Sequence, residues 1–557
     1  MLLSNMELLA TAPGGVAQLR ELILTLAVQG RLVPQDPADE PASVLLQKIR
    51  AEKDRLIAEG KIKRDKPLTA IAEEEKPFEL PVGWAFSRLG DLLLSIRSGG
   101  TPSKQNPAYW GGDIPWASVK DLGFGEPLTD TQDRITIEGL HAGSQLAPAG
   151  SILICTRMGL GKIGEALIDV AINQDLKAVQ LGAGVDKQHF INFFKTLSVV
   201  GSGMTVAGIK QDELLSFVVP VPPAAEQSRI VTRVEALMRL CDALEAKGQL
   251  EAAQHAQLVS TLLGTLTASA TPEELAANWQ RAAQHFDLLL DRPEAIDALE
   301  QTLLQLAVRG LLVPQDPTDE PASVLLQKIR AEKDRLIATG QIKRDKPLPS
   351  ITDEEKPFKL PVGWEWVPID TLATVGTGTT PSRENPAFFV GGTTPWVTSG
   401  ETGQTFIDAT EQYVTDVALA QTSLTVYSVG TLIVAMYGQG KTRGQVAELR
   451  IPAATNQACA AITLIEHAAD HRAYVKLVFE KSYDEIRELS AGGAQPNLNV
   501  GKVKSTLIPL PPLAEQSRIV TRITALRRLC ADLRQRLAER QSVQARLAEA
   551  LVASVAA

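Results

Sequence analysis

The sequence contains two copies of one frame. Residues 34–68 return as residues 314–348 with differences at only three positions, and the motif AEQSRIVTR also occurs twice. Between these copies lie two longer segments, roughly 84–220 and 364–509, that share only scattered short motifs. A constant frame that carries two divergent inserts indicates two equivalent halves in pseudo-twofold symmetry, each presenting its own insert.

Composition limits the class of protein. With 557 residues, a hydrophobic share of 44% and a charged share of 22%, the chain is long enough for several soluble domains. No apolar run is long enough to cross a bilayer and the N-terminus lacks a basic signal sequence, so we expect a cytoplasmic protein. The net charge of −9 argues against an indiscriminate nucleic-acid binder that acts alone. The cysteines are too far apart for a zinc knuckle, and we expect all four to be buried: Cys155, Cys241, Cys459 and Cys530.

Helices are predicted in the frame and sheets in the inserts. Apolar periodicity predicts helices over 19–28 and 41–57 and over their repeats, with Gly30 and Gly60 ending them. The inserts contain short apolar runs such as SILIC at 151–155, separated by Gly, Pro and Asn, which is typical of a mixed α/β or β-rich domain. Each insert ends in a proline block that leads into a long helix.

The two long helices carry a narrow apolar stripe. The stripe steps by four and three residues, which is the spacing of a coiled-coil seam. Two matching seams in one chain predict that the helices pair with each other, although packing of each helix on its own domain is the alternative. The seam residues are Ile230, Val234, Leu237, Cys241 and Leu244 in the first helix, and Ile519, Ile523, Leu526, Cys530, Leu533 and Leu537 in the second.

Several apparent active-site motifs lack an essential residue. GQGKT at 438–442 resembles the end of a phosphate-binding loop, but Ala435 stands where that motif requires glycine. NPAY at 106–109 resembles a signature of methyltransferases that act on bases, yet no glycine-rich cofactor loop follows a strand upstream. His467 and His471 have the spacing of metal ligands but lie in a polar segment. We therefore expect no catalytic residue, no cofactor and no metal.

Three motifs recur in both inserts in the same order. They are a TPS…NP…GG…PW string, a glycine-containing segment that ends in GK, and a pair of residues NQ before an apolar run. Together with the proline block that reads PLPPLAEQ and the frame LAVxGxLVPQDP, they cover nearly the whole chain. In this combination the sequence resembles the specificity subunit of type I restriction–modification systems.

The resemblance implies an architecture and a set of partners. It implies an α+β fold in which two mixed α/β target recognition domains, related by a pseudo-twofold axis, are separated by long helices that form an antiparallel coiled coil. Each domain is expected to read half of a split site in double-stranded DNA. Methylation and cleavage are expected to belong to other subunits: two methyltransferase subunits that dock on this chain, and restriction subunits in the full complex.

Five segments follow from the repeat and the resemblance. The predicted division is a helical frame at 1–80, a first recognition domain at 81–222, a central helical region at 223–360, a second recognition domain at 361–511 and a terminal helix at 512–557.

Comparison of the two inserts predicts which residues contact DNA. Positions that match in both inserts cannot distinguish two half-sites, so we expect them to hold the fold or to bind phosphate. Positions that differ are candidates for base reading, since Arg and Lys suit guanine and Asn and Gln suit adenine. The matched residues are Ser103 with Ser382, Lys104 with Arg383, Lys162 with Lys441, Asn173 with Asn456, and Gln174 with Gln457. The differing residues are Arg157 against Met436, Leu160 against Gln439, Lys120 against Gly400, and Arg443, Gln495 and Asn497 of the second insert.

Some of these residues have a structural alternative. Trp116 and Trp396 are matched and are expected to be buried core residues rather than platforms for base stacking. Asn173 and Asn456, each followed by Gln, can equally cap local turns.

Two other classes of function remain open on the sequence. One is a protein-interaction scaffold without sequence readout, and the other is a DNA methyltransferase or nuclease, which the incomplete motifs disfavour.

Overall fold

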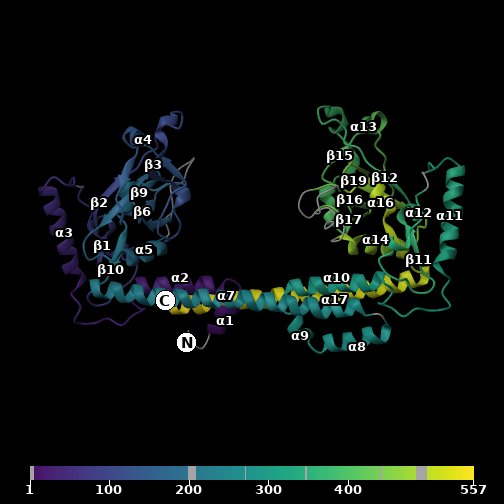
Figure 1. The fold of residues 1–557 in the computed structure, drawn as a ribbon, viewed down its shortest axis with the longest axis horizontal. Helices are drawn as coiled ribbons and strands as arrows, with labels where there is room; N and C mark the ends of the chain where they lie inside the picture. Colours follow the sequence, from purple (N-terminus) through teal and green to yellow (C-terminus); the bar gives the residue numbers. More distant parts are fainter. Residues whose placement is uncertain are drawn as a thin grey trace. The chain divides into compact units, whose positions relative to one another are not determined.

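Two compact units make up the computed structural model of the chain (Figure 1). One unit combines Met1–Glu251 with Arg540–Ala557, and the other is Ala252–Glu539. The long helices α7 (Ala224–Ala268) and α17 (Leu513–Ala556) contribute residues to both units. The structure describes residues 6–64, 66–197, 208–269, 271–344, 348–438, 442–483 and 498–556.

The frame is helical in both units, as its periodicity predicts. Gly30 ends the first frame helix with a φ of 69°, and a Cβ atom there would lie 2.9 Å from the ring of Trp84, so only glycine fits. Gly310 repeats this arrangement against Trp364. The frame helices are α1 (Met6–Thr11), α2 (Gly15–Val28) and α3 (Ala42–Ala58) in one unit, and α8 (Pro272–Ala283), α9 (Phe286–Leu289), α10 (Pro293–Val308) and α11 (Ala322–Ala338) in the other.

The first insert is a domain built on two four-stranded sheets. It begins and ends on one antiparallel strand pair, β1 (Ala85–Arg88) with β10 (Val218–Val221). One sheet has the order β2 (Leu93–Ser98), β9 (Leu176–Leu181), β6 (Ile152–Cys155) and β7 (Ile163–Glu165). The other has the order β4 (Asp133–Ile135), β3 (Trp110–Ala117), β8 (Val170–Ile172) and β5 (Gln145–Ala147). Its helices are α4 (Ile137–Gly143), α5 (Lys187–Thr196) and α6 (Gln211–Leu215).

The second insert repeats this plan with different strand lengths. It also begins and ends on one antiparallel pair, β11 (Glu365–Pro368) with β20 (Leu507–Leu510). One sheet has the order β12 (Ala373–Thr377), β19 (Cys459–Leu464), β16 (Leu432–Ala435), β17 (Val446–Leu449) and β14 (Phe406–Ile407). The other has the order β15 (Tyr413–Val414), β13 (Thr394–Val397) and β18 (Ala454–Thr455). Its helices are α12 (Ile369–Leu372), α13 (Asp416–Gln421), α14 (Ala469–Lys481) and α16 (Val500–Ser505).

Strand β6 shows why the inserts contain fully apolar runs. Successive side chains of a strand point to opposite faces of the sheet, and both faces of β6 are covered. Ile152 and Ile154 lie in one buried cluster, whereas Leu153 and Cys155 lie in another. An uninterrupted apolar run is therefore the sequence signature of this central strand, and the predicted mixed α/β domains are confirmed.

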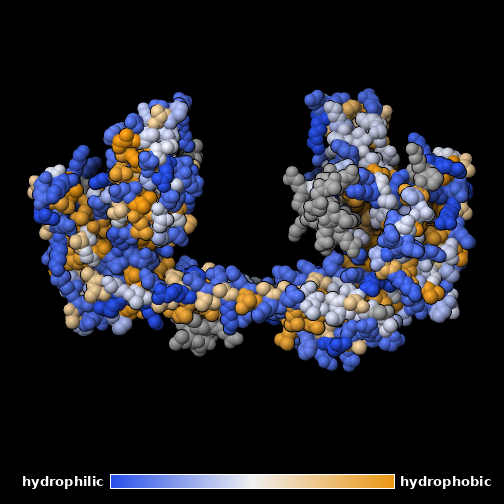
Figure 2. Space-filling model, in the orientation of Figure 1, coloured by the Kyte–Doolittle hydropathy of each residue, from blue (hydrophilic) through white to orange (hydrophobic). Residues whose placement is uncertain are grey.

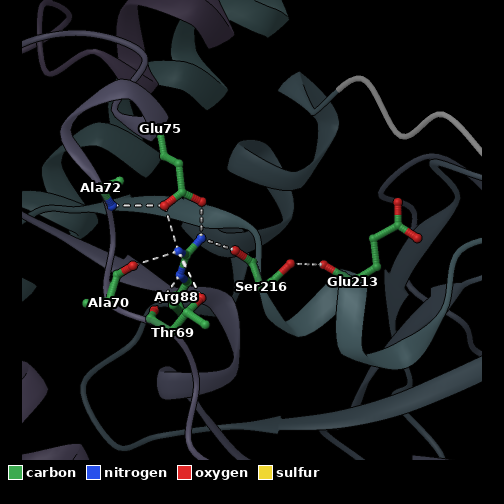
Figure 3. A network of polar contacts seen from close by, with 7 residues as sticks. All are labelled: Thr69, Ala70, Ala72, Glu75, Arg88, Glu213 and Ser216. Atoms are coloured by element: carbon green, nitrogen blue, oxygen red, sulfur yellow. Dashed lines mark hydrogen bonds and ion pairs between the residues drawn. The ribbon is translucent and has the colours of Figure 1, made fainter.

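Arg88 fastens the segment that follows α3 to the first domain (Figure 3). Its guanidinium is buried and binds both carboxylate oxygens of Glu75 at 2.8 Å. It also donates to the backbone carbonyls of Thr69, at 3.1 Å, and Ser216, at 2.7 Å. Pro368 occupies the same strand position in the second domain, so this attachment belongs to the first domain.

The long helices pack together in each unit, but the two predicted seams do not face each other. The first seam lies in a cluster with Leu19 and Ile23 of α2 and with Ala548 near the end of α17. The second seam lies in a separate cluster with Leu299 of α10 and Val259 near the end of α7. The N-terminal part of each long helix thus meets the C-terminal part of the other, as in antiparallel helices. The predicted antiparallel pairing of the two long helices is confirmed, but the seam of each helix contacts the far end of the other helix and not the other seam, because each seam spans only the start of its helix.

Each long helix also forms an ion pair with a frame helix of the same unit. Arg20 of α2 binds Asp242 of α7 at 2.6 Å, and Arg534 of α17 binds Asp297 of α10 at 2.6 Å. The alternative, in which each long helix packs on its own part of the chain, is therefore correct for most of each seam, since each seam lies mainly against the frame helix of its own unit.

No helix among the residues that the structure describes has the length and apolarity needed to cross a membrane. The face of each unit seen in Figure 2 is mostly hydrophilic, with smaller hydrophobic patches between.

All four cysteines are buried, as the sequence predicts. Burial raises the pKa of the Cys459 thiol to about 12 and also raises that of Cys155. Since the thiolate is the reactive form, we expect no cysteine of the folded protein to react within minutes with a thiol reagent at pH 8. Titration with the reagent before and after denaturation checks this, and a fast-reacting thiol in the folded protein would contradict it.

Candidate nucleic-acid interface

The first domain has an open cleft of about 550 Å³. Five of the seven residues predicted to contact DNA in this domain line it: Lys104, Lys120, Lys162, Asn173 and Gln174. Arg157 lies beside the cleft residue Met158, and Ser103 is exposed next to Lys104. The tertiary structure therefore brings together predicted residues that are up to 70 positions apart in the sequence, Lys104 and Gln174.

Two parallel strands build the floor of this cleft. Strand β3 pairs with β8 in parallel, with Trp116 opposite Ala171. The chain leaves β3 through Ser118 and Lys120 and leaves β8 through Asn173, so both turns lie at the same edge of the sheet. The loop between β6 and β7 adds Met158 and Lys162 to the cleft.

Two of the cations at the cleft are held by acidic and carbonyl oxygens. Lys120 lies 2.9 Å from the carboxylate of Asp133, and this hydrogen bond raises the pKa of Lys120. The ammonium of Lys162 donates to the carbonyl of Val119 at 2.9 Å. Lys120 is exposed and Lys162 is half-buried. These contacts fix the side chains before any ligand arrives and leave donors available on each ammonium.

Asp175 is a cleft residue that sequence reasoning missed. Its buried carboxylate accepts hydrogen bonds from the amides of Asn173, at 3.1 Å, and Gln174, at 3.3 Å. The guanidinium of Arg157 lies 3.8 Å away. Asp175 therefore positions three of the predicted residues at once. The sequence does contain an indication of its role: the matched motifs read NQD in the first insert and NQA in the second, so an acidic residue, Asp175, stands where the second insert has Ala458.

The second domain repeats part of this arrangement. Arg383 is exposed and donates to the side chain of Gln412 at 3.2 Å, and its guanidinium lies 6.0 Å from the centroid of the Trp396 ring. Gln457 accepts from the hydroxyl of Thr380, just as Gln174 accepts from Thr101. Ser382 is exposed, Asn456 and Arg443 are half-buried, and Gln439, Lys441, Gln495 and Asn497 lie outside the described residues.

The structural alternatives are confirmed for the matched tryptophans and for the matched asparagines. Trp116 is 4% exposed and Trp396 is 1% exposed, so both are core residues. Asn173 accepts from the backbone N–H two residues later at 3.1 Å, and Asn456 does the same. Both asparagines therefore cap local turns.

Two of the residue pairings taken from the sequence are wrong. Thr156 donates its backbone N–H to Asp175, and Met436 donates in the same way to Ala458, so Met436 corresponds to Thr156. Arg157 therefore corresponds to Tyr437 rather than to Met436.

The second wrong pairing concerns Lys162. The carbonyl of Lys162 accepts a hydrogen bond from the backbone N–H of Cys155. In the second domain, the carbonyl of Gln445 accepts the equivalent hydrogen bond from the backbone N–H of Ala435. Lys162 thus corresponds to Gln445 and not to Lys441. Six residues separate the first bonded pair and nine separate the second, and an ungapped comparison cannot show that difference in loop length. The pairing of Lys120 with Gly400 is correct, because the turns after β3 and β13 match residue by residue.

Comparisons with known proteins agree on one family. The family model described as type I restriction modification DNA specificity domain matches residues 81–254 and 361–540. The EcoAI specificity subunit of Escherichia coli is 35% identical over 96% of this chain and 93% of its own length. The EcoEI specificity subunit of Escherichia coli is 33% identical with the same coverage.

A solved structure matches as well. A chain of a type I R-M system, solved to explain its complex assembly and conformational transition, matches 86% of this chain and 99% of its own length. Its identity to this chain is 17% and its TM-score is 0.47. On the family model and the whole-length relatives, this chain belongs to the type I restriction–modification DNA specificity family and is a specificity subunit with two DNA specificity domains.

Proposed function

We propose that this chain reads a split site in double-stranded DNA, with one insert domain for each half, and that it performs no chemistry itself. The observation that carries the proposal is the cleft of the first domain, where Lys, Asn and Gln side chains from four separate segments converge. These side chains have the donors and acceptors that suit base edges and phosphate. Because the chain has a net charge of −9, we expect tight binding only in a complex whose partners add positive surface.

The frame presents the same helix surface in both copies, which favours the binding of two copies of one partner. Helices α3 and α11 have identical sequences, and their outward side chains are exposed in both copies. Exposed side chains contribute little to stability, so their identity beside divergent inserts favours a shared binding role. We infer two methyltransferase subunits per chain and, through them, restriction subunits. The exposed residues include Lys48, Arg50 and Asp54 on α3, and Lys328, Arg330 and Asp334 on α11.

The proposed division of labour also sets the location. DNA methylation and cleavage would act on DNA in the cytoplasm, so the chain would work there. The frame segments 1–80, 223–360 and 512–557 would hold the partners, and 81–222 and 361–511 would contact DNA.

The proposal is tested with the complex of this chain and methyltransferase subunits. Mapping of methylated adenines in a genome with and without the gene for this chain should reveal one split motif that depends on it. A scaffold without readout would leave the methylation pattern unchanged. An enzyme would transfer methyl groups from a labelled donor to DNA without any partner, and such turnover would overturn the non-catalytic role.

Arg157 is the first residue to test. Replacing Arg157 with alanine removes a guanidinium that Asp175 holds at the edge of the cleft. We expect a loss of about 1–3 kcal/mol on the cognate site and relaxed reading of one base pair in the first half-site. Tyr437→Ala is the matched control, since Tyr437 occupies the same place in the second domain and should affect only the second half-site. Binding to single-base variants of the site measures both, and equal weakening on every variant would show that Arg157 contacts phosphate.

A further inference from the structure

Met158 has an unusual backbone conformation for its residue type. Among the residues that the structure describes, it is the only residue other than glycine with a positive φ, at 61°. Left-handed backbone is unfavourable for a side chain that carries a Cβ atom, and methionine has no short polar group that could compensate locally. The Met158 side chain is also 70% exposed, so it gains little from burial within its own domain.

The loop that carries Met158 is held at both ends. The backbone N–H of Thr156 donates to the carbonyl of Asp175 at 2.8 Å, and the carbonyl of Thr156 accepts from the backbone N–H of Ile209 at 2.9 Å. On the other side, the backbone N–H of Lys162 donates to Gly159 at 3.1 Å. The surrounding structure therefore fixes the unfavourable conformation and points the methionine side chain at the cleft, which it lines.

The second domain shows that the loop does not need this side chain. The register of the backbone hydrogen bonds places Gly438 at the position of Met158, and Gly438 has a φ of 156°. Glycine adopts positive φ without a steric penalty. The first domain thus keeps a strained, exposed methionine where the equivalent loop has glycine, and its own fold does not account for that choice.

The neighbours of Met158 indicate what it contacts. Arg157 precedes it, and three lysines line the same cleft against two aspartates, so the groove has an excess of positive charge that attracts an anionic polymer. Within DNA, the thymine methyl group is the apolar group that the major groove exposes, and a flexible thioether fits an apolar contact of variable shape.

We propose that Met158 determines specificity in the first domain by packing its side chain against the methyl group of one thymine in the first half-site. The inference rests on the proposed function, because it requires that the cleft of the first domain reads base pairs. It adds an apolar contact to the polar contacts of Arg157 and Lys120 and assigns that contact to the first half-site alone.

The test combines a protein variant with a change in one DNA base. Each thymine of the first half-site, on either strand, is replaced in turn by deoxyuridine, which removes only the methyl group. For the unchanged complex with methyltransferase subunits, we expect one such replacement to weaken binding about fourfold, the equivalent of one methyl group taken out of water. The Met158→Gly complex should bind the cognate site about tenfold more weakly and should not respond to that replacement.

Folding is monitored separately. Met158→Gly relieves the strained φ, so its thermal midpoint should equal or exceed that of the unchanged chain. Met158→Leu keeps an apolar side chain of similar length and should keep the sensitivity to deoxyuridine. A Met158→Gly complex that still responds to deoxyuridine would overturn the inference. The inference would also be overturned if Met158→Gly weakened binding but the unchanged complex did not respond to deoxyuridine. That result is expected of a side chain that only inserts between base pairs.

These outcomes differ from failure of the proposed function. If the unchanged complex binds all half-site variants equally, the cleft does not read DNA and both proposals fail. If the unchanged complex discriminates and Arg157→Ala relaxes the first half-site, but Met158→Gly changes nothing, only the role of Met158 is overturned.

Discussion

Exchange of residues 85–221 for the corresponding segment of another family member should replace one half of the recognised site and leave the other half unchanged. The physical reason is the closure of the insert on one strand pair, in which Ala85 lies opposite Val221. The chain leaves the frame and returns to it at adjacent points, so a foreign domain can be accepted without displacing the frame. Because specific sites are bound about 10³–10⁷ times more tightly than other DNA, the methylation pattern should move completely.

The matched exchange of residues 365–510 is the control. The second domain closes in the same way, with Glu365 opposite Leu510, and should change only the other half. Mapping of methylated adenines measures both exchanges. The exchange of residues 85–221 removes Arg88 and with it the contact to Glu75. We expect the chain to tolerate this loss, since the second domain has Pro368 at the same strand position and lacks the contact. Changes in both halves after one exchange would show that the domains do not read DNA independently.

Glu226→Ala should lower the free energy of unfolding of the first unit by about 3 kcal/mol, because it removes an acceptor of two hydrogen bonds to a charged group. The Glu226 side chain is 1% exposed. It accepts from the indole N–H of Trp84 at 3.0 Å and from the amide of Gln35 at 3.2 Å. Without the carboxylate, the buried indole N–H lacks a partner, and the start of α7 loses its connection to the frame.

Glu515→Ala is the matched variant in the second unit. Glu515 accepts from Trp364 at 2.9 Å and from Gln315 at 2.7 Å, so we expect a similar loss there. Chemical denaturation followed by fluorescence, in chains that retain Trp84 or Trp364 as their single tryptophan, distinguishes the two units. Equal loss in both units from one substitution would contradict two independent anchors.

The pH dependence of the Glu226 effect has a definite sign. Burial raises the pKa of the Glu226 carboxyl above its ordinary value of 4.5. A raised folded-state pKa contributes stability that is complete below the unfolded pKa and is lost as the pH rises through the folded pKa. The stability difference between the unchanged chain and Glu226→Ala should therefore be larger near pH 4 than at pH 7. Denaturation at both pH values measures it.

Local patterns determined the elements of this fold. The apolar run of β6, with the buried residues Ile152 and Leu153 on opposite faces, predicts a central strand because only a strand covered on both sides needs such a run. The proline and glycine residues that bound α3 predict its ends, because they act within one turn of the chain. The repeat of the frame also predicted two domains, since identical segments fold in the same way.

The candidate site depended on information that no local pattern contains. The stripe that includes Ile230 identified an apolar helix face, but the neighbour that covers it is chosen by the three-dimensional packing of α2 and α17. Arg157 could not be matched with Tyr437 from the sequence, because the longer loop of the second domain hides the correspondence until hydrogen bonds reveal the register.

The sequence by itself determined the repeated frame, the strands and helices and the family, because each of these depends on residues close together in the chain. Only the tertiary structure decided the partners of the seams, the cleft between β3, β8 and the loop after β6, and the positive φ of Met158. These depend on contacts between segments far apart in the chain. Such contacts form when whole elements pack, and they can hold one residue in a conformation that its own sequence disfavours.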